Sequence, residues 1–182
     1  MIGGRITSIN LLQDKFVSTL FTRYKLWIFD RDGVINNKAK PPSKYILRPG
    51  DLVLNMDLIK FILSLQLFDR HITVATNQQC LSKGLIDEVQ LRKIHDVIDE
   101  SLIKIGGKSI QYFVCGHLES DGCTCRKPEP GMLNNIIVKF SVKSKETIFI
   151  GDSKTDEEAA ISAGINYLYV EELLSWLSPK QI

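Results

Sequence analysis

The stretch Leu26-Trp27-Ile28-Phe29-Asp30-Arg31-Asp32-Gly33-Val34 decides how this chain is expected to fold and act. Its first four residues form an apolar run typical of a buried β-strand, and two aspartates follow where that strand ends. Alternate residues of an extended chain point to the same side, so Asp30 and Asp32 are expected to lie close together. Like charges held that close repel unless a cation or a shared proton relieves them. A hard divalent cation such as Mg²⁺ suits these oxygen ligands, although an Asp-Gly pair is also common in ordinary turns.

Three later apolar runs lie next to polar groups that can bind phosphate or a metal. They are residues 71–75 before Thr76-Asn77-Gln78, residues 111–114 near a loop that ends in Arg126-Lys127, and residues 147–150 before Gly151-Asp152-Ser153, with Asp156 just beyond. In a doubly wound parallel sheet the carboxyl ends of the strands share one edge, and ligands bind there. We therefore expect the four groups to converge on one site.

Amphipathic helices are predicted between these strands, over residues 55–68, 82–104 with Ser82 as a cap, 130–140 and 155–163, followed by a strand at 167–170 and a helix at 171–177. This alternation predicts an α/β fold, a three-layer Rossmann-like parallel sheet flanked by helices. His95 falls in the second helix and is expected to be a surface or packing residue. Residues 36–48 are polar and aperiodic, which indicates a flap and a minimal cap over an open site.

The motifs resemble those of the haloacid dehalogenase (HAD) superfamily of phosphohydrolases. Asp30 and Asp32 fit its first motif, Thr76 its second, Lys127 its third, and Asp152 with Asp156 its fourth. The resemblance spans residues 26 to about 170. It narrows to the family of D-glycero-D-manno-heptose 1,7-bisphosphate 7-phosphatases and histidinol phosphatases at residues 31–36, 48–50, 76–78 and 125–132.

Within that family, residues 128–132 favour the heptose branch, which serves lipopolysaccharide precursor synthesis, over the histidinol-phosphate branch. This chain departs from the family where Gln79-Cys80 replaces the usual Ser-Gly, and Gln79 could narrow the pocket. The resemblance implies a HAD-type phosphatase, a phosphoric monoester hydrolase, whose partner is a small phosphorylated sugar or a related phosphomonoester.

The resemblance also implies roles for individual residues. Asp30 would attack phosphorus to form an aspartyl-phosphate, and Asp32 would act as general acid and then general base. Mg²⁺ would bind Asp30, Asp152 and the main-chain carbonyl of Asp32. Thr76 and Lys127 would hold the transferring oxygens. The substrate would be contacted by Asn77, Gln78, Arg126 and Arg48, with Asn36 as a minor candidate. Asp156 would orient the metal shell or Lys127, or else would lie on the surface at a helix start.

A second cluster follows the pattern Cys115-x-His117-x5-Cys123-x-Cys125. Three thiolates and one imidazole form a complete tetrahedral set for structural Zn²⁺, with no open position for catalysis. A disulfide is the alternative, but no signal peptide is visible and cytosolic thiols stay reduced. The family resemblance also implies zinc on this loop. Cys80 stands apart and is expected to be an inert thiol.

With 182 residues and a formal charge of +2, the chain is large enough for one globular domain and nearly balanced in charge. This composition argues against a nucleic-acid partner, and no apolar run is long enough to span a membrane. We expect a cytoplasmic enzyme that is a monomer or a weak homodimer. A catalytically silent zinc- and phosphate-binding module and a receiver-type signalling domain are the alternatives, and the second would not need the zinc cluster.

Residues 1–25 are expected to be an N-terminal extension, and residues 26–182 the HAD-like phosphatase domain. Apolar residues in the extension fall near helical spacing, at Ile9, Leu12, Phe16, Leu20 and Tyr24, with Ser8 as a possible cap. An extra helix packed on the domain is favoured over a dimer contact or a loose arm. A targeting peptide is disfavoured because Asp14 interrupts the segment.

Overall fold

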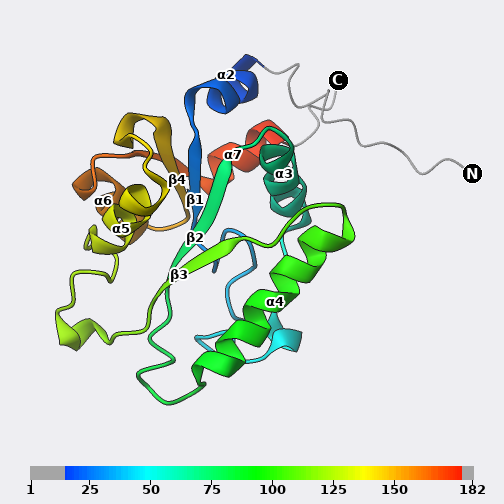
Figure 1. Cartoon of the computed structure of the whole chain (residues 1–182). Coiled ribbons are helices and arrows are strands. Elements are labelled where there is room, and N and C mark those ends of the chain that lie inside the picture. Colours follow the sequence, from blue (N-terminus) through cyan, green and yellow to red (C-terminus); the bar gives the residue numbers. More distant parts are fainter. Residues whose placement is uncertain (1–14, 178–182) are drawn as a thin grey trace, which may run out of the picture.

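A computed structural model describes residues 15–177 of the chain (Figure 1). Its sheet has five parallel strands in the order β3-β2-β1-β4-β5. The strands are β1 (Leu26–Phe29), β2 (His71–Asn77), β3 (Gln111–Cys115), β4 (Thr147–Gly151) and β5 (Asn166–Tyr169). The order changes direction at β1, which pairs with β2 on one side and β4 on the other. The predicted parallel sheet is confirmed, and a crevice is expected at this switch point.

The two faces of the sheet are covered by different helices, as Figure 1 shows. The helices are α2 (Lys15–Arg23), α3 (Met56–Leu67), α4 (Glu88–Lys104), α5 (Gly131–Phe140), α6 (Lys154–Ser162) and α7 (Val170–Leu177). Trp27 and Phe29 of β1 pack in one cluster with α3, α4 and α7, while Leu26 and Ile28 pack in the other with α5 and α6. Strand β1 is therefore buried on both faces, which explains its continuous apolar sequence.

The predicted helix boundaries hold to within a residue or two, except at α4. Asn55 caps α3 by accepting from the amide of Leu58 at 3.3 Å. The predicted start of α4 at Ser82 is wrong, because turns precede it and the helix begins at Glu88. Asp87 caps it by accepting from the amide of Gln90 at 2.7 Å. A carboxylate at this cap satisfies helix amides and complements the helix dipole better than a hydroxyl five residues earlier.

Helix α2 lies within the predicted N-terminal extension and packs on the domain through its last turns. Phe21 makes edge-on contacts with Phe61 and Phe68, at ring-centroid distances of 5.6 and 5.3 Å. Leu20 and Tyr24 are buried in the same cluster as Trp27. The predicted positions Ser8, Ile9 and Leu12 lie outside the described residues, so the division at residue 25 remains a prediction. Over residues 15–177 no helix is both long and apolar enough to cross a membrane.

Candidate active site

The carboxyl ends of β1 and β4 bring three carboxylates together. One oxygen each from Asp30, Asp152 and Asp156 lies within 4.8 Å of the others. The Lys127 ammonium fills the space beside them, with Nζ 2.8 Å from Asp30 Oδ1 and 2.6 Å from Asp156 Oδ1. It also donates to the Ala75 carbonyl at 2.9 Å, so its three hydrogens all have acceptors. The predicted convergence of residues far apart in the sequence is thus present.

Burial and neighbouring charges compete in setting the pKa values of this cluster. Burial raises the pKa of Asp30 to about 6, although the positive charge of Lys127 acts to lower it. Burial alone would lower the pKa of Lys127, but Asp30 and Asp156 outweigh it and raise that pKa. Crowded, buried carboxylate oxygens are the donor set that a hard divalent cation binds. The residues therefore fit Mg²⁺, and Asp156, buried against Lys127, is not a surface helix-start residue.

Gly33 closes the turn over these carboxylates and has a left-handed φ of +91°. A β-carbon at this position would collide with Asp152 Oδ2 and would lie 2.8 Å from the Cε atom of Lys38. Lys38 comes from the predicted flap, and its Nζ lies 2.6 Å from Asp152 Oδ2. Only glycine allows the loop after β1 to approach β4 this closely. The Asp-Gly pair is therefore both a turn and part of the site.

Asp32 lies beside the carboxylate cluster but is held by a different set of donors. Its oxygens accept from Arg31 Nη2 at 2.9 and 3.0 Å, from Asn36 Nδ2 at 2.9 Å and from Gln78 Nε2 at 2.8 Å. Burial alone would raise the pKa of Asp32, but Arg31 and these hydrogen bonds hold it below its usual range. Its side chain is still 31% exposed, so a substrate can reach it.

The polar residues after β2 are turned into the protein. Gln78 is 3% exposed and donates to both Asp32 and Thr76 Oγ1, the latter at 2.9 Å. The Asn77 side chain exchanges two hydrogen bonds with the backbone of Lys127, at 3.0 and 3.1 Å. Both residues were predicted as substrate contacts. In the structure they hold Asp32, Thr76 and Lys127 in place, because buried amides satisfy their hydrogen bonds within the protein.

The two arginines predicted as substrate contacts differ in location. Arg126 is half-buried next to Lys127, and its Nη1 donates to the His117 carbonyl at 3.4 Å. Arg48 is exposed and lines a separate cavity of about 470 Å³ with Asp87 and Lys93, and no predicted catalytic residue lines that cavity. Arg126 thus adjoins the cluster through Lys127, whereas the cavity that Arg48 lines contains none of the cluster residues.

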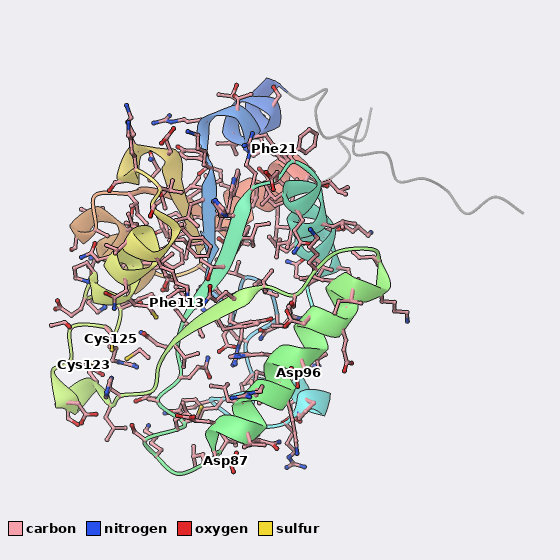
Figure 2. All side chains as sticks on the ribbon, in the orientation of Figure 1. Phe21, Asp87, Asp96, Phe113, Cys123 and Cys125 are labelled. Atoms are coloured by element: carbon pink, nitrogen blue, oxygen red, sulfur yellow. The ribbon has the colours of Figure 1, made fainter. Side chains whose placement is uncertain are left out.

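The predicted zinc ligands are Cys115 at the end of β3 and three residues of the loop between β3 and α5, two of which are labelled in Figure 2. Cys125 Sγ lies 3.3 Å from Cys115 Sγ, 3.5 Å from Cys123 Sγ and 3.2 Å from His117 Nδ1. Bonds of about 2.3 Å to a central zinc ion would give tetrahedral edges of about 3.8 Å, close to these separations. All four cysteines are free thiols, and Cys80 is buried apart from the cluster. The set fits Zn²⁺ rather than a disulfide.

Sequence reasoning missed the role of Arg31. This residue of the first motif received no role of its own, but it is fully buried behind Asp32. His95 was expected to be a surface or packing residue, and it packs against Arg31 with its Nε2 3.3 Å from Arg31 Nη1. An arginine between two motif aspartates looks solvent-exposed in sequence, and only the packing of α4 on the sheet shows where it points.

Lys127→Met should destabilise the metal-free protein by about 3–5 kcal/mol, because it leaves the buried carboxylates of Asp30 and Asp156 without their cation. Mg²⁺ should restore part of that loss. Urea unfolding with and without Mg²⁺ measures both effects. Lys38→Met is the matched control, since Lys38 is largely exposed and its pair with Asp152 should contribute about 1 kcal/mol or less. Equal losses in the two variants would contradict the assignment.

His95 should make stability depend on pH. Burial, with Arg31 nearby, lowers its pKa from 6.5 to about 3. Between those values the unfolded chain binds the extra proton, so stability falls as the pH drops below 6.5. The loss from pH 7 to pH 5 should be about 2 kcal/mol. His95→Gln keeps an acceptor for Arg31 without titrating, and urea unfolding at both pH values should show a correspondingly smaller loss. Equal slopes would contradict this.

Comparisons with known proteins place the chain in a family. Residues 83–170 match the haloacid dehalogenase-like hydrolase family. A D-glycero-beta-D-manno-heptose-1,7-bisphosphate 7-phosphatase from Bordetella bronchiseptica is 39% identical over 144 residues, which cover 77% of this chain and 76% of that protein. The chain therefore belongs to the haloacid dehalogenase-like hydrolases, within the branch of phosphatases that contains this relative. The resemblance seen in the motifs is thereby confirmed.

Two further similarities support this placement. A D-glycero-alpha-D-manno-heptose-1,7-bisphosphate 7-phosphatase from Campylobacter jejuni is 33% identical over 147 residues, covering 79% of this chain and 80% of that protein. The crystal structure of the D,D-heptose 1,7-bisphosphate phosphatase of B. bronchiseptica with magnesium and phosphate superimposes with a TM-score of 0.74 at 33% identity, covering 83% of this chain and 86% of that chain.

Proposed function

We propose that this chain is a Mg²⁺-dependent phosphatase that removes the 7-phosphate of D-glycero-D-manno-heptose 1,7-bisphosphate. The observation that carries the proposal is the cluster of Asp30, Asp152, Asp156 and Lys127 at the switch point of the sheet. It occurs in a chain whose relatives bear the name of this reaction. A silent binding module would have no need for Asp30, Asp32, Asp152 and Lys127 together.

The reaction proceeds in two steps that share Asp30. In the first, the negative charge of the bound phosphate favours the protonated form of Asp32, an oxygen of Asp30 bonds to phosphorus as the bond between phosphorus and the sugar oxygen breaks, and Asp32 gives its proton to the sugar oxygen. In the second, a water oxygen bonds to phosphorus, the bond from phosphorus to Asp30 breaks, and Asp32 takes the proton from the water. Asp32 ends as it began, and inorganic phosphate leaves.

The remaining side chains support these steps. Asp30, Asp152 and the main-chain carbonyl of Asp32 would hold Mg²⁺, which offsets the repulsion between a carboxylate nucleophile and a phosphate dianion. Lys127 and the Thr76 hydroxyl would hold the transferring oxygens. Asn77 fixes the backbone of Lys127, and Arg126 would offer its planar fork to the sugar or to the second phosphate. Zn²⁺ on the cysteine loop would keep Arg126 and Lys127 in place.

The test is phosphate release, with Mg²⁺, from both anomers of the heptose 1,7-bisphosphate, from histidinol phosphate and from p-nitrophenyl phosphate. We expect the kcat/KM for a heptose anomer to exceed that for the other two substrates by at least about 10²-fold, since recognition of the sugar contributes to transition-state binding. Both anomers are included because the relatives divide between them. A preference for histidinol phosphate would replace the proposed substrate, and no release from any substrate would indicate a binding module.

The zinc ligands also bear on where the protein works. Three thiols must stay reduced to hold the metal, and cytosol provides that condition. We therefore propose a cytoplasmic location for the enzyme. The proposal would fail if the isolated protein carried disulfides among Cys115, Cys123 and Cys125, which mass spectrometry under alkylating conditions detects.

A further inference from the structure

Arg31 is fully buried between the active site and α4, where a charged side chain is costly unless each donor has a partner. Its Nε and Nη2 donate to Asp32 Oδ1 at 3.2 and 3.0 Å, and Nη2 also lies 2.9 Å from Asp32 Oδ2. Nη2 lies 3.1 Å from Gln78 Oε1, and Nη1 lies 3.3 Å from His95 Nε2. The guanidinium therefore joins the general acid, the loop after β2 and helix α4.

The chemistry of Arg31 fixes the direction of its hydrogen bonds. A guanidinium can only donate, so the oxygen of Gln78 faces Arg31 and the amide nitrogen of Gln78 faces Asp32 and Thr76. Thr76 Oγ1 then accepts from Gln78 at 2.9 Å. The hydroxyl hydrogen of Thr76 is left to donate elsewhere. Arg31 thus orients Asp32 directly and Thr76 through one intervening side chain.

The far side of Arg31 is anchored in the core. His95 Nε2 must accept from the guanidinium, and the His95 ring stacks on Tyr112 with a centroid distance of 4.1 Å and an interplanar angle of 5°. The Tyr112 hydroxyl in turn donates to Asp99 Oδ1 at 3.0 Å. These contacts tie Arg31 to α4 and β3.

We propose that Arg31 is a positioning residue of the reaction, which holds the Asp32 carboxylate toward the leaving oxygen and turns the Thr76 hydroxyl toward the transferring phosphoryl group. This inference rests on the proposed function for its chemistry. The proposed role depends on the planar geometry of the Arg31 guanidinium rather than on its positive charge. An ammonium at this position keeps the charge but cannot make the parallel bonds to Asp32 while also reaching Gln78 and His95.

Arg31→Lys keeps the positive charge but removes the planar guanidinium. Two substrates with different leaving groups distinguish a rate loss caused by misplacing Asp32 from one caused by misplacing Thr76. A sugar oxygen must be protonated as it leaves, whereas p-nitrophenolate leaves as an anion. Misplacing Asp32 should therefore slow the first substrate more, while misplacing Thr76 should slow both equally. We expect Arg31→Lys to lower kcat/KM for heptose bisphosphate by about 10²-fold and that for p-nitrophenyl phosphate by about 10-fold or less.

Arg70→Lys is the matched control, since Arg70 donates to the Phe21 carbonyl at 3.1 Å, outside the proposed catalytic cluster. It should leave both rates unchanged. Thr76→Val, which removes the hydroxyl and keeps the pair of Arg31 and Asp32, should lower both rates by the same factor. Wild-type rates in Arg31→Lys, or equal losses on the two substrates, would overturn the positioning role. A thermal melt of each variant shows that the comparison is between folded proteins.

A second measurement does not depend on activity. In nitrogen-15 NMR spectra of the wild type, the Nε–H of Arg31 should exchange slowly with solvent because it is buried and bonded to Asp32. Asp32→Ala should make that exchange at least about 10-fold faster. Fast exchange in the wild type would overturn the inference even if the enzyme is active. Wild-type inactivity on both phosphates would refute the proposed function, while slow exchange would still support the geometry.

Discussion

Asp30→Asn should abolish phosphate release while leaving the protein folded. The amide cannot form the bond to phosphorus, and parts of an active site that act as a unit lose nearly all rate when one is removed. We expect kcat to fall by at least about 10⁴-fold. The fold should persist because Lys127 keeps its pair with Asp156 at 2.6 Å. Phosphate release with Mg²⁺ measures the rate, and a thermal melt measures the fold.

The matched control is Asp57→Asn, which changes an exposed aspartate in the first turn of α3 whose nearest ammonium, on Lys60, is 3.8 Å away. Its rate should stay within about twofold of the wild type, because an exposed pair of this kind contributes little. Acid quenching during turnover should trap an acyl phosphate on the wild type but not on Asp30→Asn. Normal turnover in Asp30→Asn would exclude Asp30 as the nucleophile.

Loss of zinc should have the second largest effect. Cys123→Ser removes one of four ligands, and we expect its zinc content, measured by elemental analysis, to fall from about one ion per chain to below about one tenth. Structural zinc contributes free energy directly to folding of the segment that binds it. The loop that ends in Arg126-Lys127 should then lose its anchor, so kcat/KM should fall by about 10²-fold and the melting temperature should drop.

Cys80→Ser provides the control for this experiment. Cys80 is a buried thiol outside the cluster, so its substitution should cost some stability and leave the zinc content unchanged. Substitution at the cluster should instead affect zinc and activity together. Full zinc content and a wild-type rate in Cys123→Ser would show that the four side chains lie together without holding a metal.

Part of the site was predictable because strand ends can be located in sequence. An apolar run followed by aspartates marks where a buried strand reaches the sheet edge, and parallel alternation brings such edges together. This rule brings Asp30, Asp152 and Asp156 to one edge of the sheet, where the structure finds them together. The zinc set was predictable for a different reason, since four ligands on one short loop need little help from the rest of the fold.

The roles of Asn77, Gln78, Arg31 and Arg48 could not be predicted in this way. Polar residues near a strand end can face either the substrate or the protein, and the sequence carries no signal for the choice. Gln78 turns inward because the buried guanidinium of Arg31 needs an acceptor there. Arg48 lines a cavity beside α4 together with Asp87 and Lys93.

The parallel α/β sheet, the four strand-end motifs and the zinc loop can be inferred from the chain's residues alone, because each depends on short patterns of apolar and ligand-type residues. The burial of Arg31 behind Asp32 and its contact with His95 become visible only in three dimensions. The same is true of Asp156, which faces Lys127 rather than solvent. These orientations arise where helices pack on the two faces of the sheet, and a local pattern holds no information about the partner that packs against it.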